Sequence, residues 1–265
     1  MNYYIKFFAE DADTTASLAD FFVEQDIQPE LDFNTPRLLA MSVAEHEELA
    51  ARWHERGLNC AVHLPFEMPD TTGRLRLNRR EVLDSLLYGV DLSRPYAPRH
   101  FVAHPYLFGD AALSGGDLDA DLRMWERVAA ACAPAGLYLE NTLEQSPGAL
   151  GRLAERLPAN CGLCFDVGHW HAMADGANKR DLDAWLDALG PFIRHLHLHD
   201  NHGHGDEHLA PGKGGIDWLH FANLVQARGL KPSVTFETCF DLRDVRDTRQ
   251  FLADHPDFCR ALGLT

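Results

Sequence analysis

Short β-rich runs alternate with amphipathic segments along the chain, and this alternation restricts the possible fold more than any other feature. Eight such runs end at polar residues, and stretches with helical periodicity lie between them. We predict strands at 3–8, 29–33, 60–63, 100–104, 137–141, 162–167, 194–200 and 233–238. Alternating strands and helices form a parallel sheet, and eight repeats within 265 residues predict one α/β domain over residues 1–265, a closed (β/α)8 TIM barrel.

Residues typical of helix ends lie between the predicted strands. Ser42 and Glu45 have the spacing of a capping box, and Ser146 stands directly before a proline, as at the first turn of a helix. Three glycines are predicted to end helices just ahead of strands, namely Gly57, Gly136 and Gly229. A doubly wound open sheet is the alternative fold, but FFAEDADTT after the first strand is not a glycine-rich phosphate loop.

Side chains able to bind metal stand at the C-terminal ends of six successive predicted strands. They are His63, His104, Glu140, Asp166, His197 and Glu237. In a barrel these strand ends converge on one mouth, where barrel enzymes carry their chemistry. Loops at the same mouth contribute His169, Asp206 and His208. Burying so many ionisable groups together is costly unless cations neutralise them, and mixed imidazole and carboxylate ligands suit Zn²⁺, Mn²⁺ or Fe²⁺.

Seven segments of the chain resemble the xylose isomerase-like barrel superfamily, and in particular its endonuclease IV branch (AP endonuclease family 2). They are AVHLP, VAHP, LENT, FDVGH, HLHDN, GDEHLAPGKGGIDW and FET, and their ligand positions run from His63 to Glu237. The resemblance implies three metal ions. His63, His104 and Glu140 would hold the first, Glu140 would bridge to a second completed by Asp166, His197 and Glu237, and His169, Asp206 and His208 would hold the third.

Two kinds of enzyme in this superfamily match the ligand pattern. The one-metal sugar isomerases and epimerases resemble the chain at Glu140, Asp166, His197 and Glu237, with His169 near the substrate. The further ligands favour the multinuclear enzymes. We therefore predict a metal-dependent hydrolase that activates water to cleave a phosphoester or amide bond of a metabolite other than DNA. A related branch of the superfamily hydrolyses an amide in corrinoid salvage, and the resemblance makes an amidohydrolase of that type one candidate. The alternative is a sugar or sugar-phosphate isomerase or epimerase in which Glu140 and Glu237 form an acid/base pair.

Cleavage of DNA at abasic sites is a second alternative, which the charges of the chain disfavour. The segment LPFEMPD after the third strand is acidic where a phosphate backbone would pass, and the formal net charge is −16. We expect a small polar or anionic substrate and no nucleic-acid or membrane partner. No apolar run approaches the ~18 residues of a membrane span and the first residues lack a signal-peptide layout, so we expect a cytoplasmic protein.

Several neighbours of the predicted ligands are candidates for contact with substrate. His199 shares the facing of His197 in its strand. The other candidates are Lys213 in PGKG, Trp170 beside FDVGH, and Arg74 and Arg76 after the third strand. The six cysteines are scattered, and the C-x-x-C of Cys161 and Cys164 has no partner pair, so we interpret both as packing residues rather than as a redox or zinc site.

Overall fold

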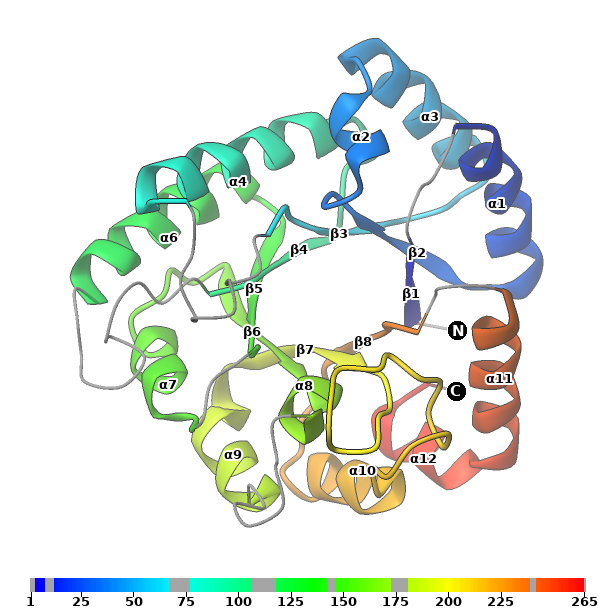
Figure 1. The fold of residues 1–265 in the computed structure, drawn as a ribbon, viewed down its shortest axis with the longest axis vertical. Helices are drawn as coiled ribbons and strands as arrows, with labels where there is room; N and C mark the ends of the chain where they lie inside the picture. The colour runs from blue at the N-terminus through cyan, green and yellow to red at the C-terminus, as the bar shows by residue number, and fades with distance from the viewer. Residues whose placement is uncertain are drawn as a thin grey trace.

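The computed structural model describes residues 3–7, 12–66, 77–105, 118–142, 146–172, 181–238 and 242–264, which form a closed parallel barrel (Figure 1). The strands pair in sequence order, and β1 also pairs with β8 to close the cylinder. They are β1 (Tyr3–Phe7), β2 (Gln28–Asp32), β3 (Ala61–His63), β4 (His100–Ala103), β5 (Gly136–Glu140), β6 (Cys161–Asp166), β7 (Ile193–Leu198) and β8 (Ser233–Phe236). The predicted barrel is therefore confirmed, and every predicted strand lies within two residues of its observed bounds.

Helices surround the barrel and connect successive strands (Figure 1). The longer helices are α1 (Ala12–Gln25), α3 (Val43–Glu55), α4 (Arg79–Ser93), α6 (Leu118–Cys132), α9 (Leu182–Leu189), α10 (Trp218–Ala227) and α11 (Leu242–Asp254). Shorter elements are α2 (Pro36–Ala40), η1 (Arg94–Tyr96), α7 (Gly148–Ala154), α8 (Val167–Ala172), η2 (Gly190–Phe192) and α12 (Pro256–Leu262). Within the described ranges, no helix is both long and apolar enough to cross a bilayer.

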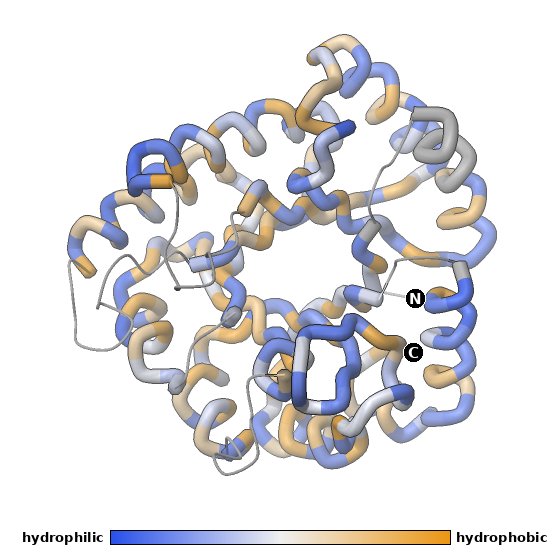
Figure 2. The backbone as a smooth tube through the Cα atoms, in the orientation of Figure 1, coloured by the Kyte–Doolittle hydropathy of each residue, from blue (hydrophilic) through white to orange (hydrophobic). Residues whose placement is uncertain are grey.

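Hydrophobic and hydrophilic residues alternate along the backbone (Figure 2), and successive side chains of a strand point to opposite faces of the sheet. In β7, Leu196 and Leu198 belong to the hydrophobic core, which lies between strands and helices. His195 and His197 point the other way and contact Glu30 of β2 across the barrel. The barrel interior therefore collects polar side chains, while the surrounding layer supplies the apolar burial that stabilises the fold.

The predicted helix boundaries are only partly correct. The capping box is present, because Ser42 Oγ accepts from the Glu45 amide and Glu45 accepts from the Ser42 amide. Gly57 and Gly229 follow helices at φ of +72° and +65°, where glycine avoids the strain of a side chain. Gly136 is instead the first residue of β5, since α6 already ends at Cys132.

The cap predicted at Ser146 is also wrong by one position. Helix α7 begins at Gly148, and Pro147 occupies its N-cap position without a side-chain cap bond. Proline pre-sets the backbone angle needed at a helix start, which explains why the helix begins here without a capping hydroxyl.

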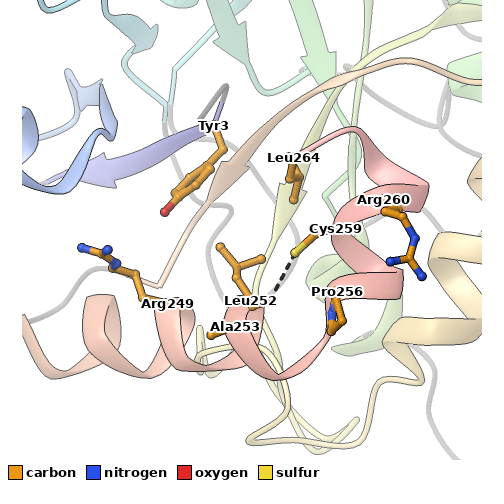
Figure 3. Close-up of a pocket in the computed structure, with 8 residues that line it drawn as sticks. All are labelled: Tyr3, Arg249, Leu252, Ala253, Pro256, Cys259, Arg260 and Leu264. Carbon is orange, nitrogen blue, oxygen red and sulfur yellow. Dashed lines mark hydrogen bonds between the residues drawn. The ribbon is translucent and has the colours of Figure 1, made fainter.

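A cavity of about 420 Å³ opens near the beginning of β1, where Tyr3, Arg249, Cys259 and Leu264 are among the lining residues (Figure 3). It lies at the end of the barrel where the strands begin, away from the strand ends that carry the predicted metal ligands. None of those predicted ligands lines this cavity.

Candidate metal centre

The structure brings all nine predicted ligands together in three groups at the C-terminal ends of the strands. Within each group the potential ligand atoms lie within 4.8 Å of one another. The central group is Glu140, Asp166, His197 and Glu237; the His63 group is His63, His104 and Glu140; and the His169 group is His169, His199, Asp206 and His208. Glu140 belongs to two groups, and His169 Nδ1 of the third group lies 3.0 Å from Glu140 Oε1, so the three groups adjoin one another.

In the central group, three carboxylates converge on one imidazole nitrogen. His197 Nδ1 lies 2.9 Å from Glu237 Oε2, 3.4 Å from Glu140 Oε2 and 3.8 Å from Asp166 Oδ2. Strand register explains the convergence, since Asp166 of β6 pairs with His197 of β7, and Glu140 ends β5. Glu237 follows β8 directly and is hydrogen-bonded through its amide to Leu198 of β7.

The His63 group lies on one side of the central group and shares its glutamate. His63 Nε2 is 3.0 Å from Glu140 Oε2, and His104 Nε2 is 3.8 Å from the same oxygen. The two imidazoles meet edge to face, with ring centres 5.1 Å apart, and Phe66 stacks on His104 at 4.2 Å. Phe66 therefore forms an apolar wall beside these two histidines.

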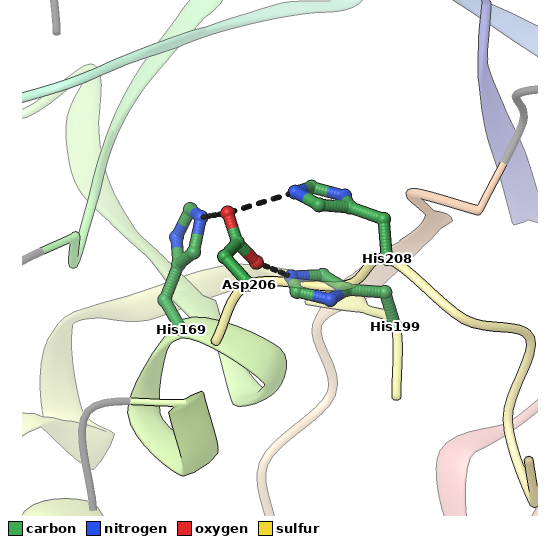
Figure 4. A group of neighbouring side chains, drawn as sticks. All are labelled: His169, His199, Asp206 and His208. Carbon is green, nitrogen blue, oxygen red and sulfur yellow. Dashed lines mark hydrogen bonds and ion pairs between the residues drawn. The ribbon is translucent and has the colours of Figure 1, made fainter. Parts of the chain in front are cut away.

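The His169 group surrounds the carboxylate of Asp206 (Figure 4). His208 Nε2 lies 3.0 Å from Asp206 Oδ2, His169 Nε2 lies 3.3 Å from the same oxygen, and His199 Nε2 lies 3.6 Å from Oδ1. His199 and His208 stack with ring centres 3.9 Å apart. His199, which we predicted to contact substrate, therefore lies among potential metal ligands and is also 3.2 Å from Asp166.

The glycine of FDVGH makes room for His199. A Cβ atom added to Gly168 would lie 2.1 Å from Cε1 of the His199 ring, far inside van der Waals contact. Helix α8 starts immediately after Asp166, and Asp166 Oδ1 accepts from the amide of His169 at 2.6 Å. The strand-to-helix turn thus places Asp166 and His169 together and leaves space for the imidazole that approaches from β7.

Asp200 anchors the loop that carries Asp206 and His208. Its carboxylate accepts from the Gly212 amide at 2.9 Å and from Trp218 Nε1 at 2.9 Å, and it is fully buried. A Cβ atom on Gly214 would lie 2.4 Å from this carboxylate, so the glycines of PGKGG permit the close approach. The backbone of Asp200 is also bonded twice to Leu209, which holds the loop over the barrel mouth.

Backbone carbonyls hold three of the candidate ligand histidines by one ring nitrogen. Nδ1 lies 3.0 Å from Leu64 O in His63, 3.0 Å from Asn141 O in His169 and 2.8 Å from Glu237 O in His208. A carbonyl only accepts, so each Nδ1 carries the proton. In the neutral rings, Nε2 then presents its lone pair toward a carboxylate group, as in a protein metal site.

The donors in the central group fit a divalent cation. Glu140 Oε1, Asp166 Oδ2, His197 Nδ1 and Glu237 Oε2 are buried and make no hydrogen bond within the described residues. Unsatisfied buried polar atoms are costly, and negative oxygens at this density repel one another. A cation removes both costs, and the mixture of carboxylates with imidazole suits Zn²⁺, Mn²⁺ or Fe²⁺.

A layer of buried charges that we did not predict from the sequence lies beneath this mouth. Lys6 forms an ion pair with Glu237 and lies 3.9 Å from Asp32. Burial acts to lower the pKa of Lys6, but Glu237 and other carboxylates outweigh it and raise its pKa, so the ammonium stays charged. The signal was present in YYIKFF and PELDF, whose polar residues alternate with apolar ones and therefore face the interior.

Charge balance supports more than one ion. Among the described residues, the barrel interior holds one buried ammonium, Lys6, and five buried carboxylates, Glu30, Asp32, Glu140, Asp166 and Glu237. With neutral histidines the formal charge is −4, which two divalent cations would balance. Asp206 adds a further negative charge at the more exposed side of the mouth.

The other residues that we predicted to contact substrate do not belong to the three groups. Lys213 forms an exposed ion pair with Asp247 of α11 at 3.1 Å, so its ammonium is engaged away from the three groups. Trp170 is partly buried and packs against the hydrophobic core from α8. Arg74 and Arg76 lie outside the described residues. Cys161 is half-buried and Cys164 is buried, and Cys164 lies close to His195 and His197.

A family model described as the xylose isomerase-like TIM barrel matches residues 22–255. The chain belongs to this family. This confirms the resemblance drawn from the sequence motifs. Two curated proteins, from Methanocaldococcus jannaschii and Sinorhizobium fredii, are 29% and 34% identical over 96 and 80 residues, or 36% and 30% of this chain. The matches span 31% and 24% of those proteins' own lengths.

Several solved structures have a similar architecture, and each aligns with nearly the whole length of this chain. A D-tagatose 3-epimerase-like protein is 17% identical with a TM-score of 0.71 over 98% of both chains. A putative xylose isomerase from Rhodospirillum rubrum is 16% identical with a TM-score of 0.73, covering 97% of this chain and 98% of its own. TTHB071 from Thermus thermophilus, soaked with zinc chloride, is 23% identical with a TM-score of 0.71, covering 100% and 99%. Similarity at these identities establishes the shared fold.

The comparisons contradict our main functional prediction. Two of these three structures bear the names of an epimerase-like protein and a putative xylose isomerase. The prediction of a hydrolase was therefore wrong, and the alternative of an isomerase or epimerase is the better supported one. The error has a physical origin, because a set of clustered ligands specifies that cations bind but not which bond the site breaks.

Proposed function

We propose that this protein is a metal-dependent isomerase or epimerase of a sugar or sugar phosphate. The observation that carries the proposal is the central group, in which Glu140 and Glu237 flank the same nitrogen of His197. Proton transfer next to a carbonyl needs two things that this arrangement offers, a bound cation and a positioned carboxylate. The names of the similar structures favour the same chemistry.

Glu140, Asp166, His197 and Glu237 would hold the catalytic ion, and the His63 and His169 groups would each hold one further divalent ion. Zn²⁺, Mn²⁺ and Fe²⁺ all suit these donors. When bound, such an ion acts as a Lewis acid that polarises the sugar carbonyl and makes the neighbouring C–H more acidic.

Glu237 is suited to be the base. Burial raises its pKa, but the Lys6 ammonium opposes burial most strongly, and the pKa stays well below the usual value, so the carboxylate is ionised. It takes the proton from the carbon next to the carbonyl, and the electron pair of the C–H bond moves toward the carbonyl oxygen to give an enediolate. Lys6 holds the Glu237 carboxylate in place during this transfer.

The return of the proton decides the product. Glu140 comes from β5 and Glu237 follows β8, so the two carboxyl groups reach the centre from different strands. Return from Glu140, after it has taken a proton from solvent, to the other face of the same carbon gives the epimer. Return from Glu237 to the former carbonyl carbon, while the proton of the neighbouring hydroxyl passes to the former carbonyl oxygen, gives the isomer.

The test is proton exchange. The purified protein is loaded with Zn²⁺, Mn²⁺ or Fe²⁺ and incubated in D₂O with a panel of ketoses, aldoses and their phosphates, and deuterium at carbon is followed by NMR. We expect exchange with at least one sugar, and a loss of 10²–10⁴-fold in Glu140→Gln and Glu237→Gln. Glu47→Gln, an exposed change on α3, is the matched control.

Two results would contradict the proposal. One is the absence of deuterium in every sugar although each metal form binds its ions. The other is exchange that survives in both glutamine variants, which would show that neither glutamate moves the proton.

A further inference from the structure

A chain of polar side chains runs through the barrel interior beneath the central group. Ser233 Oγ lies 2.7 Å from His195 Nδ1, and His195 Nε2 lies 2.9 Å from Thr235 Oγ1. The Thr235 hydroxyl donates to Glu30 Oε2 at 2.6 Å. Glu30 Oε1 is 3.1 Å from His197 Nε2, and all except the half-buried Ser233 are fully buried.

The directions of these bonds follow from what each group can donate. An ionised carboxylate only accepts, so the Thr235 proton is committed to Glu30. The oxygen of Thr235 must then accept from His195 Nε2–H, and His195 Nδ1 accepts from the Ser233 hydroxyl. At the other end of the chain, His197 faces Glu30 with Nε2 and the central carboxylates with Nδ1, so a cation bound by Nδ1 would leave the ring proton on Nε2, toward Glu30. In the neutral ring, the Nδ1 lone pair then faces the three carboxylates of the central group.

His197 differs from three other candidate ligands in the group that its second ring nitrogen faces. Backbone carbonyls hold His63, His169 and His208, whereas a buried carboxylate faces His197. A carboxylate partner both orients an imidazole and makes its free nitrogen a stronger metal ligand. Glu30 Oε1 and His197 Nε2 lie 3.1 Å apart without the alignment of a straight hydrogen bond, so the buried carboxylate acts on the ring through its charge and its position.

We infer that Glu30 is a positioning residue that directs Nδ1 of His197 into the central group, and that Thr235 holds Glu30 in place. The inference rests on the metal centre of the proposed function. Glu30, His100 and His195 also lie close enough to form a metal-binding group. Hydroxyls already occupy both ring nitrogens of His195, which favours the hydrogen-bonded chain over a cation at that depth.

The experiment compares zinc affinity and the tautomer of His197 in the full-length protein. Metal-free wild type, Glu30→Gln and Thr235→Val are titrated with Zn²⁺ against a chelating dye. Long-range ¹H–¹⁵N spectra of the zinc-loaded proteins report the tautomer, with the His197 signals identified by their loss in His197→Gln. We expect 10- to 100-fold weaker zinc binding at the central site of Glu30→Gln and altered His197 nitrogen shifts.

Two controls separate positioning from a general loss of structure. Asp121→Asn changes another buried carboxylate, paired with Arg79 on the outer helices, and should leave zinc affinity and the His197 shifts unchanged. Thr235→Ser keeps the hydroxyl and should bind zinc like wild type, whereas Thr235→Val should bind it several-fold more weakly. This threonine pair carries the test if Glu30→Gln does not fold.

The outcomes distinguish this inference from the proposed function. If no sugar exchanges protons but Glu30→Gln still weakens zinc binding and alters the His197 signals, the positioning role stands while the proposed reaction fails. Unchanged zinc affinity and unchanged His197 signals in a folded Glu30→Gln would overturn the positioning role. A crystal structure of the zinc-loaded protein with an ion bound by Glu30, His100 and His195 would also overturn it.

Discussion

Individual buried charges in this protein depend on one another. Lys6 is almost completely buried and forms an ion pair with Glu237, close to Asp32. Removing one partner of a buried pair leaves the other desolvated and uncompensated, which costs far more than losing an exposed pair. The ammonium therefore stabilises the carboxylates of the centre whenever cations are absent.

We predict that Lys6→Met lowers the free energy of unfolding of the metal-free protein by about 3 kcal/mol. The loss should be smaller in the zinc-loaded protein, because the ions then compensate the same carboxylates. Urea denaturation of both forms measures the difference.

Lys213→Met is the matched control for this prediction. Lys213 pairs with Asp247 at the surface, so its loss should cost no more than about 1 kcal/mol, with or without zinc. A Lys6→Met protein as stable as the control would contradict the view that Lys6 compensates the centre.

The helices and strands are the supports that position the candidate ligands. Strands β3 to β8 each end within one residue of a candidate ligand, and helices or loops lead the chain from one strand to the next. Helix α3 illustrates how such supports are set locally. Its capping box satisfies amides of the first turn, and His46, Leu49 and Trp53 on its inner face are buried.

We predict that Ser42→Ala lowers the free energy of unfolding by about 1 kcal/mol, because the Glu45 amide loses its acceptor. Glu47→Ala lies on the exposed face of the same helix and should change stability by less than the cap variant. Chemical denaturation of both variants checks the prediction, and equal effects would show that the cap contributes nothing particular to the fold.

Barrel closure determines the properties of the whole molecule. Because β1 pairs with β8, Lys6 from the first strand meets Glu237 after the last one. The closed cylinder concentrates carboxylates in its interior, and their repulsion opposes folding unless positive charge is present. Stability of the entire chain should therefore respond to divalent cations.

We predict that chelation lowers the melting temperature by about 5 °C or more, and that added Zn²⁺ restores it. Zinc at 100 times its dissociation constant stabilises a folded protein by roughly 2.7 kcal/mol per site, and 1 kcal/mol corresponds to about 2–4 °C in a chain near this size. Circular dichroism melts with EDTA, and with zinc after removal of EDTA, provide the measurement. Identical melting curves in both conditions would contradict a metal-stabilised centre.

Much of this arrangement could be predicted from local patterns. Strand positions follow from hydrophobic periodicity, and ligands at strand ends follow from the chain order of a parallel barrel. All nine predicted ligands lie in the three groups for this reason. The reaction was predicted wrongly, since the types of ligand residues determine cation binding but not the substrate or the bond that changes.

Other features depend on contacts between residues far apart in the chain. Three contacts join segments that are distant in the sequence: Lys6 with Glu237, Glu30 with His197, and Gly168 with the His199 ring. Periodicity shows which face of a strand a side chain occupies, because that depends on local backbone geometry. Distances between strands depend on how the cylinder closes and packs, so the tertiary structure alone decides which charges compensate one another.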